Sequence, residues 1–278
     1  MRRLEGKNAL ITGSSTGMGQ KIAMRFAQEG ANIAINYLKQ PDEPEIVGKL
    51  IEEARQSAEK AGRKFLVVHA DISKEKDVAR MFNEVVDGLG RLDILINNAG
   101  IKKPGKNHET SMIDFDRVIA VNLRGAFLCA RQAIKHFLKR EGGGVIINNS
   151  SVHQIIPRPK YLSYSISKAG IANFTKTLAL EYARKGIRVN AIAPGAIDTP
   201  INRAPIEDPE CWRELEDHIP MGRAGTPEEI AGVLVFLASD DASYITGQVI
   251  YTCGGLTLYP DQSDQWTPSN CSHLVSGE

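Results

Sequence analysis

Residues 9–19 read ALITGSSTGMG, and this stretch decides the fold class. Ala9 to Ile11 predicts a short buried strand, and glycines at positions 13, 17 and 19 lead from it into an amphipathic helical pattern that ends at Gly30. This order suits a pyrophosphate, because glycine lets the backbone approach phosphates and a helix N-terminus offers free N–H groups. The spacing G-x-x-x-G-x-G differs from the usual dinucleotide-binding spacing, so a tight turn without a ligand is the alternative.

The rest of the chain repeats the alternation of strand and helix. Seven apolar, partly β-branched runs predict strands at Ala9–Ile11, Ile33–Ile35, Phe65–Val68, Ile94–Ile96, Val145–Ile147, Ile187–Ile192 and Val249–Tyr251. Helical patterns cover about 18–28, 46–61, 75–89, 113–140, 161–185 and 227–238. Strict alternation implies right-handed crossovers. We therefore predict an α/β protein with a single Rossmann-type doubly wound domain, in which a seven-stranded parallel sheet carries helices on both faces.

Two segments depart from this alternation and set the predicted boundaries. Residues 198–225 contain several prolines and Trp212, and we expect them to form a lid over the substrate, with a packed surface excursion as the alternative. Residues 261–278 lose the periodicity and predict a C-terminal tail. Residues 1–260 would then form the nucleotide-binding and catalytic domain.

Charge and hydrophobicity argue against several classes of protein. The 278 residues include 34 Lys and Arg against 33 Asp and Glu, whereas a nucleic-acid binder needs clustered positive charge. The longest apolar run, Ile230–Ala238, is too short to cross a membrane, and we expect a cytoplasmic protein. Cys129, Cys211, Cys253 and Cys271 lie far apart, so we expect no metal site. A small molecule is the partner that these observations favour.

Tyr164 and Lys168 are spaced so that their side chains leave one face of a predicted helix, one turn apart. A phenol has a pKa near 10, so a value near 7 costs roughly 4 kcal/mol. One ammonium about 4 Å away supplies about that much at an effective dielectric near 20. A tyrosine tuned in this way can act as a general base on an alcohol or as an acid on a carbonyl. An ordinary surface pair is the alternative.

Other polar residues follow the predicted strands. Ser151 comes just after the Val145–Ile147 strand, residues 97–100 (NNAG) close the Ile94–Ile96 strand, and Pro194-Gly195 follows the Ile187–Ile192 strand. The carboxyl ends of parallel strands meet at one edge, where such sheets bind ligands. We therefore expect these residues to lie close to the glycine loop and to the Tyr164–Lys168 pair.

Taken together, these motifs resemble the short-chain dehydrogenase/reductase family from about residue 4 to residue 260. The matching segments are TGSSTGMG (12–19), Asp71-Ile72, NNAG (97–100), Asn122, Ser151, YSISK (164–168) and PG (194–195). The resemblance implies an enzyme that passes hydride directly between a substrate carbon and NADP or NAD, without a metal. It also implies a homotetramer, with one interface formed by the helices near 113–140 and 161–185 and another by the C-terminal segment.

The resemblance assigns roles to individual residues. Tyr164 is implied to be the general acid/base, Lys168 to lower its pKa and bind the nicotinamide ribose, and Ser151 to hydrogen-bond the reacting oxygen. Asn122 is implied to keep a water in the proton path, and Asp71 to bind the adenine amine. Besides Asp71, Tyr164 and Lys168, the cofactor contacts that we expect are Gly13, Ser15, Thr16, Gly17, Met18, Gly19, Ile72, Asn98, Ala99, Gly100, Pro194, Gly195, Ile197 and Thr199.

The choice between the two cofactors depends on the end of the second predicted strand, which reads Asn36-Tyr37-Leu38-Lys39. An NAD-specific site places an acid there to bind the ribose 2′-hydroxyl, and none is present. A 2′-phosphate would meet no repulsion and could pair with Lys39, so we count Asn36 and Lys39 among the cofactor contacts and favour NADP over NAD. The alternative leaves Lys39 in solvent.

Within the family, the sequence is most similar to bacterial glucose 1-dehydrogenases, through residues 150–157, 178–202, 219–223 and 254–260. Oxidation of glucose to gluconolactone is therefore the expected reaction. Ser151 and Tyr164 would contact the substrate, and His153 would reach a sugar hydroxyl, with a structural histidine as the alternative. Lys102 replaces a glutamate and Asp198 an asparagine of those enzymes, and both are also candidate substrate contacts.

Other functions stay open at this point. Lys102, Lys103 and Lys106 could favour an anionic substrate or an acidic carrier, although solvated lysines are the alternative. A reductase of 3-oxoacyl carrier protein, or of another ketone, would use the same residues in the opposite direction. A nonenzymatic nicotinamide-binding sensor is a further alternative, which the presence of Ser151 and Tyr164 disfavours.

Overall fold

The computed structural model describes residues 2–38, 44–199 and 209–258 and confirms the predicted fold class. The strands form one sheet in the order β3-β2-β1-β4-β5-β6-β7, and every neighbouring pair is parallel. Each strand contains one of the predicted apolar runs. Their bounds are Asn8–Ile11 (β1), Asn32–Tyr37 (β2), Phe65–His69 (β3), Ile94–Asn97 (β4), Gly144–Asn149 (β5), Ile187–Pro194 (β6) and Val249–Thr252 (β7).

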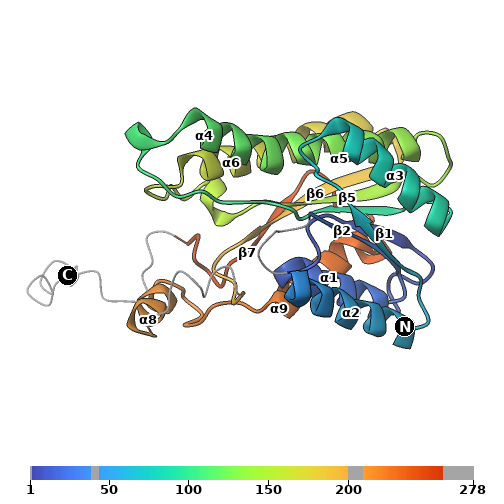
Figure 1. Cartoon of the computed structure of the whole chain (residues 1–278), viewed down its shortest axis with the longest axis horizontal. Coiled ribbons are helices and arrows are strands. Elements are labelled where there is room, and N and C mark those ends of the chain that lie inside the picture. Colours follow the sequence, from blue (N-terminus) through green and yellow to red (C-terminus); the bar gives the residue numbers. More distant parts are fainter. Residues whose placement is uncertain (1, 39–43, 200–208, 259–278) are drawn as a thin grey trace, which may run out of the picture.

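Alternate strand residues build a separate core on each face of the sheet. Ile11 belongs to the core that includes α1 (Gly17–Gln28) and α9 (Pro227–Ala238), whereas Leu10 belongs to the core that includes α3 (Glu75–Leu89) and α5 (Ala126–Phe137). Figure 1 shows this division, with α1, α2 and α9 on one side of the sheet and α3 to α6 on the other. Both faces are therefore buried, as continuous apolar runs in parallel strands require.

The predicted helix over 113–140 is interrupted in the structure. It consists of α4 (Met112–Ile119), a π-helical segment η2 (Ala120–Gly125) and α5. A π turn inserts a residue without ending the amphipathic pattern, so periodicity does not reveal it. α5 ends at Phe137, short of residue 140, and Gly142 and Gly143, both with positive φ, lead the chain into β5.

The helices α2 (Pro44–Lys60) and α6 (Leu162–Tyr182) agree with the predicted ranges to within a few residues, and η4 (Ala183–Lys185) completes the range predicted for α6. The helices that were not predicted are α8 (Pro209–Asp217), within the expected lid, and the short turns η1 (Asn107–Glu109), η3 (Val152–Gln154) and η5 (Asp240–Ala242). Among the residues described, no helix has the length and apolar character needed to span a membrane.

The expected lid lies partly outside the described residues, and the expected tail lies wholly outside them. Residues 200–208, within the expected lid, and 261–278, the expected tail, are among those not described. The described part of 198–225 contains α8, where we expected irregular structure, and a parallel bridge between Ile197 and Gly225. Ile219 is buried, and the Met221 N–H donates to the Gly254 carbonyl oxygen at 3.0 Å. This part of the segment is therefore anchored to the chain that follows β7.

The sheet order creates a crevice at its carboxyl edge. The chain leaves β1 toward β2 on one side and returns to β4 on the other side of β1. The two sides of β1 are thus joined by connections that leave in opposite directions, and doubly wound sheets bind ligands at such a switch point. The glycine loop follows β1 and residues 98–100 follow β4, so the fold places both predicted motifs at this crevice.

Candidate active site

The glycine loop after β1 packs against the end of β4 without room for side chains. Gly13 has a φ of +58° and Gly17 a φ of +57°, a region that other residues rarely adopt. A Cβ atom at Gly13 would lie 2.7 Å from the Ala99 Cα atom, and one at Gly19 would lie 2.5 Å from the Gly13 carbonyl oxygen. Only glycine at positions 13 and 19 permits this approach.

The first turn of α1 has unused hydrogen-bonding capacity. Thr16 caps the helix, but its side chain makes no cap hydrogen bond, and the first turn holds no acidic residue. The place that a Cβ atom at Gly17 would take has no atom within 4 Å. Open N–H groups, the positive end of the helix dipole and space beside the backbone fit a pyrophosphate. Ser15, Thr16, Gly17 and Met18, all half-buried, could hold it.

Two asparagines hold the glycine loop in place. The Asn36 Oδ1 atom accepts a hydrogen bond from the Gly13 N–H at 3.2 Å, and its Nδ2 atom donates to the Ala70 carbonyl oxygen at 3.0 Å. The Asn98 Nδ2 atom donates to the carbonyl oxygens of Thr12 and Gly13 at 3.0 and 2.9 Å. Both side chains are thus engaged by the protein, and their evident role is to shape the loop.

The structure describes only some of the residues that we expect near the cofactor ribose. Asn36 is buried beneath the loop rather than presented at its surface. Lys39, the proposed partner of a 2′-phosphate, lies outside the described residues. Tyr37 and the exposed Leu38 occupy the described end of β2.

Asp71 and Ile72 follow β3 at the same edge of the sheet. The Asp71 Oδ1 atom accepts hydrogen bonds from the Ser73 N–H at 3.0 Å and from the Ser73 hydroxyl at 2.7 Å. Ile72 is buried, and a Cβ atom at Gly125 would lie 2.8 Å from its Cδ1 atom. The Asp71 carboxylate is thus fixed in orientation and 20% exposed at the carboxyl edge of the sheet.

Ser151, Tyr164 and Lys168 converge as the sequence predicted. Ser151 caps η3 just after β5, and Tyr164 and Lys168 stand one turn apart on α6. A side-chain hydrogen bond joins Ser151 to the Tyr164 phenol. The Lys168 Nζ atom lies 5.5 Å from the centre of the Tyr164 ring and donates to the Asn149 carbonyl oxygen at 2.6 Å.

Burial controls the ionisation of both α6 side chains. Burial raises the pKa of Tyr164, while the hydrogen bond from Ser151 and the charge of Arg158 act in the opposite direction. Burial also lowers the pKa of Lys168 to about 8. Ser151 and Arg158 are the groups that lower the Tyr164 pKa here, and desolvation outweighs them. The expected lowering of that pKa by Lys168 stays a prediction.

The π-helical segment η2 places Asn122 beneath the site. Asn122 is buried, its Oδ1 atom accepts from the Ile101 N–H at 2.8 Å, and its Nδ2 atom donates to the Ile101 carbonyl oxygen at 2.9 Å and to the Ser167 hydroxyl at 3.0 Å. A Cβ atom at Gly100 would lie 3.4 Å from the Asn122 Oδ1 atom and 3.6 Å from the Lys168 Nζ atom. Asn122 therefore connects the chain after β4 to α6.

The segments after β4 and β6 form the rest of the carboxyl edge of the sheet. The N–H groups of Asn98 and Ala99 donate to the Thr12 hydroxyl at 3.0 and 3.1 Å. Ile197 and Thr199 are buried, and the Asp198 N–H donates to the Gly225 carbonyl oxygen at 2.8 Å. Pro194 ends β6, and Gly195 is so close to Cys253 that a Cβ atom there would lie 3.0 Å from the Cys253 Cα atom.

His153 packs beside Tyr164, and the charges of Lys102 and Arg158 act on its pKa. The His153 ring lies edge-on to the Tyr164 ring with 6.2 Å between their centres, and its Nδ1 atom lies 3.1 Å from the Ile156 carbonyl oxygen. Burial, Arg158 and Lys102 lower the pKa of His153, and burial and Arg158 lower that of Lys102. The predicted substrate contacts His153 and Lys102 therefore share one environment with Arg158.

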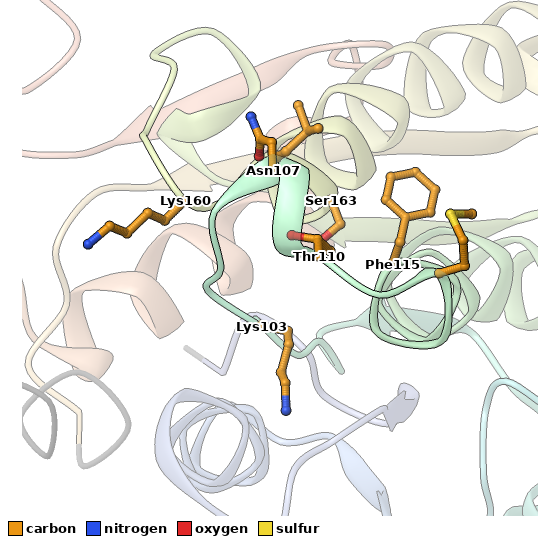
Figure 2. Close-up of a pocket in the computed structure, with 8 residues that line it drawn as sticks. Lys103, Asn107, Thr110, Phe115, Lys160 and Ser163 are labelled. Atoms are coloured by element: carbon orange, nitrogen blue, oxygen red, sulfur yellow. The ribbon is translucent and has the colours of Figure 1, made fainter.

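A small cavity of about 110 Å³ lies between the chain after β4 and the start of α6, as Figure 2 shows. Its lining residues are Lys103, Asn107, Thr110, Met112, Phe115, Lys160, Leu162 and Ser163. Ser163 precedes Tyr164 on α6, but Ser151, Tyr164 and Lys168 do not line the cavity. It therefore lies beside the reacting groups rather than between them.

Sequence reasoning missed Arg158, Asn149 and Ser167. Arg158 acts on three site residues from a loop, and no regular spacing links it to them. One available signal is its position between Pro157 and Pro159, just before the helix that carries Tyr164. The role of Asn149 depends on its backbone carbonyl, which no side-chain pattern reports.

Comparison with protein-family models gives one match over most of the chain. A family described as "Enoyl-(Acyl carrier protein) reductase" matches residues 13–257. The match begins at the first glycine of the loop and ends after β7, so it includes the whole sheet edge described above.

Comparisons with individual proteins agree. The chain is 47% identical to "Glucose 1-dehydrogenase" of Gluconobacter oxydans (strain 621H), covering 95% of this chain and 97% of that protein. It is 48% identical to "3beta-hydroxysteroid dehydrogenase 1" of Eggerthella lenta, covering 92% and 96%. The solved structure of a mutant Serratia marcescens short-chain dehydrogenase/reductase matches with a TM-score of 0.83 at 33% identity, covering 92% of this chain and 100% of that one.

Proposed function

The chain belongs to the short-chain dehydrogenase/reductase family, and on that premise we propose that it transfers hydride between a secondary alcohol or sugar hydroxyl and NAD(P). The observation that carries the proposal is the convergence of Ser151, Tyr164 and Lys168 beside the glycine loop. The likeness to a glucose 1-dehydrogenase supports glucose as the substrate, with gluconolactone as the product.

In alcohol oxidation, Tyr164, Ser151 and Lys168 each have a separate role. Tyr164 accepts the hydroxyl proton, and the C–H bond of the same carbon breaks as the carbonyl forms. The chemistry that a bound nicotinamide supplies is acceptance of the hydride at C4. Ser151 donates a hydrogen bond to the reacting oxygen, and the Lys168 ammonium stabilises the Tyr164 phenolate. In the reverse direction, Tyr164 donates the proton to the carbonyl oxygen.

Asn122 is proposed to support the proton path to solvent. Its side chain bonds Ile101 and Ser167, and it lies in a π-helical segment, a feature often found at functional sites. Its Oδ1 atom and the Lys168 Nζ atom both face Gly100, and we propose that a water held there continues the path. This proposal places Asn122 in a positioning role.

The cofactor is proposed to be NADP in preference to NAD. Supporting this choice, residues 36–39 at the end of β2 contain no carboxylate to bind a ribose 2′-hydroxyl. The test is the ratio of kcat/KM values for the two cofactors at saturating alcohol. A value for NAD that exceeds the value for NADP by about tenfold, or 1.4 kcal/mol, contradicts the preference.

A ketone reductase is the second candidate, because the same Ser151–Tyr164 pair would serve the reverse direction, with Tyr164 donating the proton to the carbonyl oxygen. One screen separates the two candidates. It measures reduction of NAD and NADP with aldoses and polyols, and oxidation of NADPH with keto esters. Glucose oxidation supports the first candidate, and keto-ester reduction alone supports the second. No turnover on any of these compounds contradicts the proposed hydride transfer.

We further propose that residues 198–225 close over the substrate and that the chain forms a homotetramer. For the assembly, the support is exposed apolar side chains on the helices expected at an interface. These are Ile113 on α4 (81% exposed), Phe127 on α5 (44%) and Leu180 on α6 (88%). Large exposed apolar groups on neighbouring helices are typical of surfaces that pair with another chain.

A further inference from the structure

Gln154, on η3 just after Ser151, forms side-chain hydrogen bonds to two different parts of the sheet. Its Oε1 atom accepts from the Ser150 hydroxyl at 2.7 Å, and its Nε2 atom donates to the Tyr251 hydroxyl at 2.8 Å. Ser150 follows β5, whereas Tyr251 lies on β7, the strand at the edge of the sheet. Gln154 therefore joins the segment that carries Ser151 to a strand that does not pair with β5.

The pairing of the strands explains how one side chain reaches both hydroxyls. Asn149 of β5 pairs with Ile192 of β6. The next residue of β6, Ala193, pairs with Tyr251. Ser150 directly follows Asn149, so Ser150 and Tyr251 lie at the same level on either side of β6. Side chains at one level of a parallel sheet point to the same face.

The Ser150 hydroxyl extends this connection to the helix that carries Tyr164. Its Oγ atom lies 3.0 Å from the Lys168 carbonyl oxygen on α6, and Ser150 is 3% exposed. A hydroxyl has one proton, which Ser150 shares between this carbonyl oxygen and the Gln154 amide. A buried hydroxyl that loses a partner is costly, so these contacts hold the end of β5 against α6.

Gln154 also holds Ser151 through its backbone. The Gln154 N–H donates to the Ser151 carbonyl oxygen at 3.0 Å, and the His153 N–H donates to the Ser151 Oγ atom at 3.2 Å. The position of the Ser151 hydroxyl, which bonds the Tyr164 phenol, therefore depends on the position of η3. Gln154 fixes η3 both through its backbone and through its side chain.

We propose that Gln154 and Tyr251 are positioning residues that hold the Ser151 hydroxyl where hydride transfer requires it. This inference rests on the proposed hydride transfer, and neither residue is assigned a contact with substrate or cofactor. Gln154 acts through Ser150 and Ser151, and Tyr251 acts by fixing the Gln154 side chain. Because a small displacement of a catalytic group lowers the rate sharply, loss of these bonds should lower kcat more than it changes KM.

The first experiment removes the two side-chain hydrogen bonds of Gln154. Gln154→Met removes both and keeps the length of the side chain, and Tyr251→Phe removes one. With the best alcohol from the substrate screen, we expect kcat to fall about tenfold in Gln154→Met and about threefold in Tyr251→Phe. KM and the dissociation constant for NADPH should change by less than about twofold. Gln248→Met and Tyr244→Phe, at exposed residues, are the matched controls and should change kcat by less than about twofold.

A second experiment separates positioning from a general loss of structure. If Gln154 acts through the Ser151 hydroxyl, adding Gln154→Met to Ser151→Ala should lower kcat by less than about twofold further. A structural defect would lower kcat equally in both backgrounds. Gln154→Glu has a carboxylate that can accept from the hydroxyls of Ser150 and Tyr251, so its kcat should lie within about threefold of the wild type.

The outcomes distinguish this inference from the proposed function. A wild-type kcat in Gln154→Met, an equal fall in the Ser151→Ala background, or a Gln154→Glu variant as slow as Gln154→Met overturns the inference and leaves the hydride transfer standing. If Gln154→Met does not fold, as judged by circular dichroism, the same comparison is made with Tyr251→Phe. No turnover by the wild-type protein with any alcohol, sugar or ketone overturns both.

Discussion

At the residue scale, Lys168 is a buried lysine whose positive charge is destabilised by its surroundings. It is buried on α6, and its ammonium has a backbone carbonyl, that of Asn149, as its hydrogen-bond acceptor. Burial lowers its pKa from 10.5 to about 8. The folded chain thus binds this proton less tightly than the unfolded chain, so the charged lysine reduces stability below about pH 8.

The stability of Lys168→Met relative to the wild type should therefore depend on pH. Below about pH 8 the methionine variant lacks the whole cost of the buried charge, and this advantage shrinks as the pH rises from about 8 toward 10.5, the ordinary pKa of lysine. We expect the difference in free energy of unfolding, variant minus wild type, to fall by about 2 kcal/mol between pH 8 and 9.5. Denaturant titrations at both pH values measure it, with the exposed Lys106→Met as control. A difference that does not change with pH contradicts the burial of a charged Lys168.

Ser151→Ala should slow turnover and also move its pH dependence. Loss of one preorganised donor to the reacting oxygen is expected to lower kcat/KM by about 100-fold. The hydrogen bond from Ser151 lowers the pKa of Tyr164, so its loss raises that pKa further. Since Tyr164 must be ionised to accept a proton, the acidic limb of the alcohol-oxidation profile should shift to higher pH. An unshifted limb would mean that Tyr164 is not the titrating base.

What the sequence could predict at this scale follows from spacing. Residues spaced like Tyr164 and Lys168 always lie on one face of a helix, so the sequence alone predicted that they lie close together. The effect of Arg158 depends on the path of a loop that holds Lys160 at positive φ, which residue spacing does not encode. Asn36 lies where we expected it, yet its side chain turned out to hold the glycine loop.

At the scale of elements, the glycine loop and the start of α1 form one rigid unit. A Cβ atom at Gly19 would lie 2.5 Å from the Gly13 carbonyl oxygen and 2.6 Å from the Ser14 Cα atom. Both are backbone atoms, so any side chain at position 19 must displace the loop.

Gly19→Ala should therefore weaken cofactor binding by at least about tenfold and cost about 1–3 kcal/mol of stability through overpacking. The matched control is Gly232→Ala in α9, where a Cβ atom has nothing within 4 Å and where helix propensity predicts a gain of up to about 1 kcal/mol. Fluorescence titration with NADPH and denaturant unfolding measure the two effects. Wild-type NADPH affinity in Gly19→Ala would show that the loop does not form the phosphate site.

The sequence predicted the strands better than it predicted some of the helices. All seven strands contain the predicted runs, because short, partly β-branched apolar runs that alternate with helical patterns are typical of strands in a parallel sheet. The π-helical segment η2 was not predicted, since its one-residue insertion leaves the apolar face nearly unchanged. α8 was not predicted because Pro209 and its polar residues gave no long periodic pattern.

At the scale of the whole molecule, alternation predicted the fold class but not the order of the strands. The order β3-β2-β1-β4-β5-β6-β7 places β1 and β4 side by side, and the crevice between their loops follows from that arrangement. The identity of the substrate is a matter of a few side chains around Tyr164, which the fold does not specify.

The assembly gives a prediction at the same scale. Light scattering at micromolar concentration should find four chains, because apolar groups on α4, α5 and α6 are left exposed in the single chain. Leu180→Glu should lower the molar mass while preserving the folded circular-dichroism spectrum. A wild-type monomer at that concentration contradicts the proposed homotetramer.

The central claim is that Tyr164 performs proton transfer in a nicotinamide-dependent dehydrogenase. Its most direct test is Tyr164→Phe, measured with the best alcohol from the substrate screen and, in parallel, by NADPH titration. We predict a fall in kcat/KM of about 1,000-fold or more, with the dissociation constant for NADPH changed by less than about threefold. Turnover within about tenfold of the wild type would contradict the claim and remove Tyr164 from the mechanism.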